Sequence, residues 1–281
     1  MAFANTEQAE FWSQSAPMWI ELQDRMEETG GLPGRLAMDR LDLRAGQRVV
    51  DLGCGAGRTT LELASRVLPG GEAVGVDISA EMLAAGRERA ARLGAGNVEF
   101  VHADVQVSDL GQARFDAAYS RFGVMFFADP VAAFANVRRA LRPGAVLSFV
   151  CWQGLFDNEW MLIPGAAVAT VTGSMPPIPG PGEPGPFSLA DPERTRAVLD
   201  AAGFGSIVIT PHSDHIVISE DRIPEVARTS SRTGRVRVML QDADEPTRER
   251  AVAAIEEALR ARLQGGEVRA SRGVLLVTGQ A

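Results

Sequence analysis

The spacing of hydrophobic positions changes at about residue 45. Before it, apolar side chains recur at helical spacing, and they include Phe11, Trp12, Met18, Trp19 and Leu22. After it, short apolar runs alternate with helical stretches as far as residue 152. Strands that are apolar on both faces are typical of a parallel sheet covered by helices. Residues 45–152 are therefore predicted to form a doubly wound α/β core. A helical N-terminal cap at 1–44 precedes it.

Residues 153–281 are predicted to complete the sheet and to add lid insertions on the substrate side, rather than to form an independent domain. A helix at 158–172 is followed by 173–186, where ten of fourteen residues are Pro or Gly. Such a segment resists regular structure, because Pro lacks a backbone donor and Gly is costly to order. The elements expected beyond it are a helix capped by Asp191, strands at 206–211 and 214–219, helices at 220–231 and 245–263, and a last strand at 272–279.

Composition excludes several partners and mechanisms. The net charge of −8 disfavours nucleic acid as a partner. Neither a membrane span nor a signal peptide is recognisable, so we expect a cytoplasmic protein. All 28 basic residues are Arg, and the absence of Lys excludes Schiff-base catalysis and the phosphate-binding lysine of a P-loop. The arginines between Arg228 and Arg237 form either a solvated face or a segment that attracts an anionic substrate.

The first strand of the core ends in a glycine-rich turn, Val49-Val50-Asp51-Leu52-Gly53-Cys54-Gly55-Ala56-Gly57. Glycines let a backbone approach a ligand closely, and a helix N-terminus after the turn exposes free N–H groups. A nicotinamide-binding turn would need a third glycine at position 58, which is Arg58. The carboxylate of Asp51 suits a cationic ligand and suits a pyrophosphate badly. A Rossmann dehydrogenase is therefore disfavoured.

Two further carboxylates end the next two strands. Asp77 lies twenty residues beyond Gly57 and can accept two hydrogen bonds from a ribose diol. Asp104 ends the third strand, where it can accept a hydrogen bond from the exocyclic amine of adenine. Ligand sites of open α/β sheets lie at the carboxyl ends of the strands, so these acids are expected to converge on one crevice.

These segments resemble class I S-adenosylmethionine-dependent methyltransferases of the type-11 or UbiE-like branch. The resemblance rests on five motifs in order, VVDLGCGAG, VGVDISAEML, VEFVHADV, FDAAYSRFGVMFFADP and RRALRPGAVL. It implies a mostly parallel seven-stranded sheet of order 3-2-1-4-5-7-6 whose last strand is antiparallel. It also implies S-adenosylmethionine as the cofactor.

The resemblance assigns roles to nine residues. Asp51, Gly53 and Gly55 would line the methionine portion of the cofactor, and Asp77 would hold the ribose hydroxyls. The others would surround the adenine or the sulfonium: Ile78, Met82, Asp104 and Val105 at the adenine, and Ser120 near the sulfonium. Ile78, Met82 and Val105 are equally consistent with plain core packing. No metal site is expected.

The expected activity is methyl transfer to a small, partly apolar molecule, quinone-like or a secondary metabolite, by in-line displacement that depends on proximity and orientation. The alternative is a non-catalytic S-adenosylmethionine-binding regulatory or partner protein. No motif indicates a general base, so the catalytic residues stay unassigned. We expect the acceptor pocket to include Trp12, Trp19, Phe122 and Trp152, and Arg121 to bind either the cofactor carboxylate or an anionic substrate. A homodimer is possible.

Overall fold

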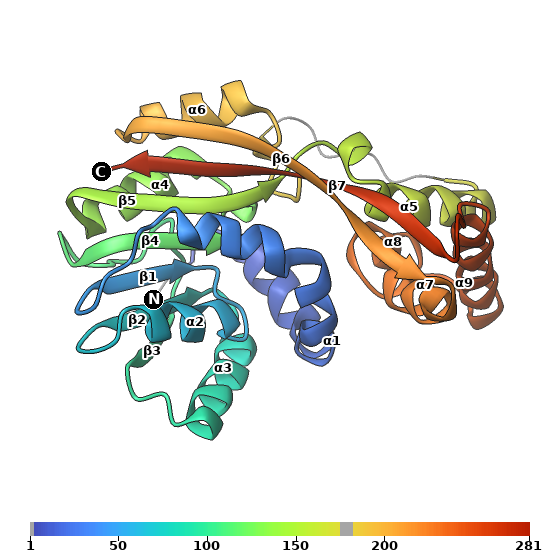
Figure 1. Ribbon diagram of the computed structural model, residues 1–281, viewed down its shortest axis with the longest axis horizontal. Helices are drawn as coiled ribbons and strands as arrows, with labels where there is room; N and C mark the ends of the chain where they lie inside the picture. The colour runs from blue at the N-terminus through green and yellow to red at the C-terminus, as the bar shows by residue number, and fades with distance from the viewer. Residues whose placement is uncertain (1–2, 175–181) are drawn as a thin grey trace. The chain divides into compact units, whose positions relative to one another are not determined.

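The computed structural model describes residues 3–174 and 182–281 (Figure 1). The chain forms two compact units. The first consists of the described parts of Met1–Trp152, Pro181–Pro211 and Val274–Ala281, and the second of the described parts of Gln153–Gly180 and His212–Gly273. The division into a cap, a core and a sheet-completing part stays a prediction. Among the described residues, none of the helices is both long and apolar enough to span a membrane.

A seven-stranded sheet runs through the fold in the order β3-β2-β1-β4-β5-β7-β6 (Figure 1). Its strands are β1 (Arg48–Leu52), β2 (Glu72–Asp77), β3 (Val98–His102), β4 (Phe115–Arg121), β5 (Leu141–Trp152), β6 (Gly205–Ser219) and β7 (Glu267–Gln280). The first five strands pair in parallel, whereas β7 runs antiparallel to β5. The predicted fold class and strand order are confirmed.

Local sequence explains where the helices of the first unit begin and end. These are α2 (Arg58–Arg66), α3 (Ala80–Leu93), α4 (Pro130–Ala140) and α6 (Pro192–Ala201). The hydroxyl of Ser79 caps α3, which stops at Gly94 in a left-handed conformation. Helices α4 and α6 each have an aspartate at the N-cap followed by proline, which is preorganised for the first helical turn. The candidate residues lie before these helices, at or just after the carboxyl ends of the strands.

A single 34-residue helix, α1 (Thr6–Asp39), precedes β1 and packs on α3, β4 and β5. Its small residues allow a close approach to the sheet. The phenol of Tyr119 donates to the carbonyl of Gly34 over 2.8 Å, and the hydroxyl of Ser148 donates to the carbonyl of Ala37 over 2.7 Å. A Cβ at Gly34 would lie 2.5 Å from Cδ of Arg121, so a larger residue there would displace the arginine side chain.

The second unit has a helical core of its own. Helices α5 (Glu159–Thr172), α7 (Ile223–Ser231), α8 (Gly234–Met239) and α9 (Glu245–Arg260) bury a cluster that includes Ile163, Val168, Ile223, Ala251 and Ile255. The expected helices at 158–172, 220–231 and 245–263 thus correspond to α5, to a short 3₁₀ turn followed by α7, and to α9. Helix α8 was not expected, and the arginines between Arg228 and Arg237 lie on α7, α8 and the turn that joins them.

The C-terminal part differs from the expected pattern in one strand. The strands predicted at 206–211 and 214–219 form one strand, β6, that continues through Pro211. Proline is tolerated there because β6 is the last strand of the sheet, so a missing N–H need not interrupt a ladder. In the loop predicted at 173–186, residues 175–181 lie outside the described residues.

Candidate functional site

The three glycines of the turn after β1 have different surroundings: two are closely packed and one borders open space. Gly53, Gly55 and Gly57 all have positive φ values, of 67°, 54° and 75°. A Cβ at Gly53 would lie 2.8 Å from Cα of Gly123, and one at Gly57 would lie 2.5 Å from the ring of Phe100. Nothing lies within 4 Å of a Cβ built at Gly55. The first and third glycines are therefore required for packing, whereas the middle one borders open space.

Asp51 is completely buried at the carboxyl end of β1. Its Oδ2 accepts hydrogen bonds from the hydroxyls of Thr59 and Thr60, both over 2.7 Å. Its Oδ1 has no hydrogen-bond partner in the part of the chain that the structure describes. Burial raises the pKa of Asp51 to about 6, although the two threonines oppose the shift. A buried oxygen without a partner is unusual, and a bound donor would satisfy it.

Asp77 connects the end of β2 to the glycine turn. Its Oδ2 accepts from the backbone N–H of Gly55 over 2.7 Å, and its Oδ1 accepts from that of Ser79 over 2.9 Å. Burial raises the pKa of this carboxyl above its ordinary value. Because a carboxylate oxygen can accept two hydrogen bonds, each oxygen of Asp77 keeps one lone pair for a further donor. The site can therefore receive two hydroxyl groups.

Asp104 is hydrogen-bonded to the residues just before α1, a contact that the sequence did not predict. Its Oδ2 accepts from the backbone N–H groups of Ala4 and Asn5, both over 3.0 Å, and its Oδ1 accepts from that of Gln106 over 2.9 Å. The side-chain amide of Asn5 also donates to the carbonyl of Phe126 over 2.8 Å. The residues just before α1 thus lie against the carboxyl end of β3, and only Oδ1 keeps room for another donor.

The remaining candidate residues are placed around these carboxylates. Ser120 is buried; its hydroxyl donates to the carbonyl of Leu52 over 2.7 Å and accepts from the N–H of Gly123 over 3.2 Å. Met82 and Val105 are both buried, and Ile78 is half-buried. The carbonyl of Ile78 is hydrogen-bonded to His102 over 3.0 Å, so that histidine has a structural partner.

Arg121 is held by a glutamate that sequence reasoning missed. Its Nη1 lies 2.7 Å from Oε2 of Glu27 on α1, and Glu27 also pairs with Arg58 and Arg35, each at 3.2 Å. Three guanidinium groups thus share one carboxylate. The pattern held no signal for this pairing, because Glu27 and Arg121 lie 94 positions apart.

The expected aromatic residues form two groups. Trp12 of α1 contacts Trp19 and, edge to face, Phe126, with ring centroids 5.8 and 4.9 Å away. Phe122 and Trp152, at the carboxyl ends of β4 and β5, stack almost in parallel with centroids 3.9 Å apart. Both groups thus supply flat apolar surface within the first unit.

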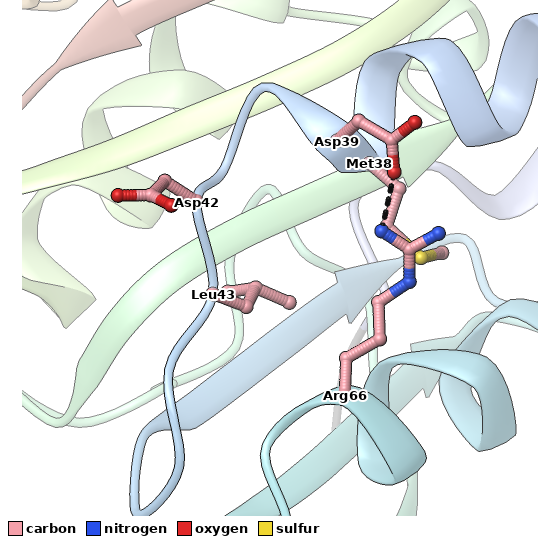
Figure 2. A pocket seen from close by; sticks show the side chains of 5 residues that line it. All are labelled: Met38, Asp39, Asp42, Leu43 and Arg66. Carbon is pink, nitrogen blue, oxygen red and sulfur yellow. Dashed lines mark hydrogen bonds and ion pairs between the residues drawn. The ribbon is translucent and has the colours of Figure 1, made fainter.

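An open pocket of about 340 Å³ lies elsewhere and is lined by Met38, Asp39, Asp42, Leu43 and Arg66. Figure 2 shows the guanidinium of Arg66 pointing toward Asp39, with which it is paired. Arg66 also pairs with Glu62 over 2.8 Å. The pocket is formed by the end of α2 and the residues before β1, away from the glycine turn. Because its cation is already neutralised, we do not assign the candidate site to it.

Comparison with known proteins finds relatives of the segment that carries the glycine turn. Residues 49–144 match the family described as methyltransferase domain. The ubiquinone/menaquinone biosynthesis C-methyltransferase UbiE of Pseudomonas savastanoi pv. phaseolicola is 37% identical over 114 residues, which are 40% of this chain and 44% of that relative. The chain thus spans less than half the length of that relative.

Solved structures share the fold. The YcgJ protein from Bacillus subtilis has a TM-score of 0.57 at 19% identity, covering 87% of this chain and 96% of that one. The [4+2]-cyclase SpnF has a TM-score of 0.55 at 18% identity, covering 95% of each chain. At such identities the likeness shows the fold alone. The chain thus shares its fold with these proteins, and its residues 49–144 match a methyltransferase domain.

Proposed function

We propose that this protein binds S-adenosylmethionine and transfers its methyl group to a small, partly apolar acceptor. The observations that carry the proposal are the buried, unpartnered Oδ1 of Asp51 and the open space at Gly55, four residues further along the glycine turn. A buried carboxylate oxygen needs a donor, and the ammonium group of a methionine moiety is such a donor. The glycine at position 55 leaves room for that moiety.

The chain's other carboxylates fit the rest of this cofactor. The two free lone pairs of Asp77 can accept hydrogen bonds from the ribose hydroxyls, and the free lone pair on Oδ1 of Asp104 can accept one from the adenine amine. Ile78, Met82 and Val105 offer apolar surface to the adenine ring. Gly53 would line the methionine portion, and Ser120 would lie near the sulfonium. These assignments extend the family's pattern to this chain.

When bound, the cofactor supplies a sulfonium-activated methyl group for in-line displacement. The protein's contribution is to hold donor and acceptor in line and to exclude water. Neither Tyr119 nor Cys54 serves as a base or nucleophile in this proposal. Burial raises the pKa of the Tyr119 phenol, which donates to Gly34, and burial together with Asp77 and Asp51 raises that of the Cys54 thiol.

The acceptor is inferred to be a small molecule with an apolar part. The name of the relative UbiE refers to quinone biosynthesis, and the stacked rings of Phe122 and Trp152 lie at the carboxyl ends of β4 and β5. Trp152 is only 8% exposed, so the half-buried ring of Phe122 is the member of the pair that offers apolar surface to a conjugated ring. A quinone-like molecule is therefore the first acceptor to test. The predicted homodimer and cytoplasmic location stay predictions.

The binding test compares two glycines. Gly55→Ala places a methyl group in the open space beside the turn, whereas Gly46→Ala does the same at a second left-handed glycine with nothing within 4 Å, in the loop before β1. Both variants place alanine at a positive φ, of 54° and 83°. S-adenosylhomocysteine binding, measured by calorimetry, should weaken at least about tenfold in the first variant and stay unchanged in the second. Equal affinities would count against a cofactor at this turn.

A second assay separates an enzyme from a non-catalytic binding protein. The protein is incubated with S-adenosylmethionine labelled in the methyl group and with a panel of hydroxylated quinones and phenols. Transfer of label to an acceptor, abolished by Gly55→Ala and retained by Gly46→Ala, supports the enzyme. Tight cofactor binding without transfer to any member of a wide panel would favour the regulatory or partner role.

A further inference from the structure

Phe122 has a backbone conformation that aromatic residues rarely adopt. Its φ is +61°, in the left-handed region, directly after the end of β4. For a side chain of this size the conformation is strained, and it persists only where the surroundings hold it. Strained residues of this kind cluster at functional sites, so the contacts that hold Phe122 deserve a functional explanation.

Two contacts hold Phe122 in place. Its N–H donates to the carbonyl of Val150 over 3.0 Å. Its ring stacks on Trp152 at an interplanar angle of 10°, and Trp152 is itself only 8% exposed. On α1, a Cβ at Gly30 would lie 3.2 Å from the ring, so the helix packs tightly against the ring at this glycine.

The strained conformation allows the chain to turn back after Ser120. Three residues later, the N–H of Gly123 reaches the hydroxyl of Ser120, which also donates to Leu52 at the end of β1. A Cβ at Gly123 would lie 2.7 Å from the carbonyl oxygen of Leu52 and 2.9 Å from Cα of Gly53. The backbone after β4 is thus pressed directly against the first glycine of the turn after β1.

We propose that Phe122 is a positioning residue for the cofactor. Its left-handed backbone, fixed by the stack on Trp152, holds Gly123 against Gly53 and thereby sets the conformation of the glycine turn. The proposal rests on the proposed function, because it assumes that the turn binds S-adenosylmethionine. Phe122 acts through Gly123 and need not touch the cofactor.

Three replacements separate the ring from the backbone. Phe122→Tyr keeps the ring and its stack, Phe122→Leu loses the stack but keeps the strain, and Phe122→Gly loses both. We expect S-adenosylhomocysteine affinity within about twofold of the unaltered protein for Tyr, about tenfold weaker for Leu, and restored to within about threefold for Gly. Recovery in the glycine variant is the signature of a backbone role, since glycine has even less side chain than leucine.

Ala113→Gly provides the matched control. Ala113 also has a left-handed φ, of +47°, but it lies just before the other end of β4. Relief of its strain should raise the melting temperature and leave S-adenosylhomocysteine affinity unchanged. Leucine and glycine variants that bind equally weakly, or that alter only the melting temperature, would overturn the positioning role. Failure of the unaltered protein to bind would overturn the proposed function, and this inference with it.

Discussion

Asn5 donates its backbone N–H to Oδ2 of Asp104, 99 positions away, and Ala4 donates to the same oxygen. One carboxylate therefore anchors the start of the chain to the end of β3. Asp104 is buried, with 2% of its surface exposed, so both bonds are charge-assisted and shielded from water. The acid expected to recognise adenine thus also orders the segment that precedes α1.

Asp104→Ala should release this segment. We expect the amide groups of Ala4 and Asn5 to exchange with solvent faster, and the free energy of unfolding to fall by about 1–3 kcal/mol. Hydrogen exchange by NMR measures the first and urea titration the second. Asp109→Ala removes an exposed carboxylate that accepts from Gly111, and it should leave these two amides unchanged. Unaltered exchange in Asp104→Ala would contradict the anchoring.

Asp77 is expected to contribute most to cofactor affinity. Asp77→Ala removes both ribose acceptors and the bond to the N–H of Gly55, so S-adenosylhomocysteine should bind at least about a hundredfold more weakly. Calorimetry measures the change. Asp116→Ala is the control, because Asp116 accepts from the N–H of Arg48 over 2.8 Å at the start of β1, away from the glycine turn. Similar affinities in the two variants would refute the ribose assignment.

The buried carboxyl of Asp51 makes stability depend on pH. Its pKa is about 6 in the folded protein and near 4 when unfolded, so the folded state holds the extra proton between these values. Stability therefore falls as pH rises from about 4 to above 6, by up to about 3 kcal/mol. Asp51→Asn should remove this decline. Urea titrations across the range compare the two proteins, and parallel curves would show that Asp51 does not titrate there.

The same carboxyl should make S-adenosylmethionine binding depend on pH in the opposite sense. An ammonium group is attracted only to the ionised form of Asp51, which is the minor form below pH 6. Affinity should therefore increase about tenfold between pH 5.0 and pH 7.5. Calorimetry with Asp51→Asn should show weaker binding and a flatter profile. A wild-type profile without a slope would exclude Asp51 as the partner of the ammonium group.

Glu27 should contribute more to stability than an ordinary surface acid. Its side chain is 18% exposed and pairs with Arg35, Arg58 and Arg121, of which Arg58 also pairs with Asp24 over 2.7 Å. Glu27→Gln removes the carboxylate that Arg35 and Arg121 share and leaves Arg58 with Asp24 alone, and we expect a loss of about 1–3 kcal/mol in the free energy of unfolding. Glu62→Gln, which breaks only the partly buried pair with Arg66, should lose less than about 1 kcal/mol. Equal losses in the free energy of unfolding would show that Glu27 stabilises the fold no more than an ordinary ion pair does.

Much of the first unit could be predicted from its sequence, because its patterns are local. Each strand is a short apolar run, and each turn carries glycine or aspartate. The strand order was expected from the resemblance of the motifs to a known family. The contact between Gly53 and Gly123 could not be predicted from the sequence. Both glycines were visible, but the positive φ of Phe122 between β4 and Gly123 has no sequence signature.

The contacts of α1 could not be predicted at all. The pairs Asn5–Asp104 and Glu27–Arg121 join positions 99 and 94 residues apart, and nothing near either partner specifies the other. Such contacts depend on how the helix packs on the sheet. The single strand β6 was missed for a simpler reason, because Pro211 interrupts the pattern although the outer edge of the sheet tolerates it.

The strand order also has a consequence for synthesis on the ribosome. β7, the last strand of the chain, is inserted between β5 and β6, so both neighbours are made before it. Until residues 267–280 leave the ribosome, the apolar segment of β5 from Val146 to Trp152 has an open edge. Such an edge can pair with other chains. The nascent protein should therefore depend on chaperones at this stage, and ribosome-bound chains that lack β7 should be more sensitive to proteases than released chains.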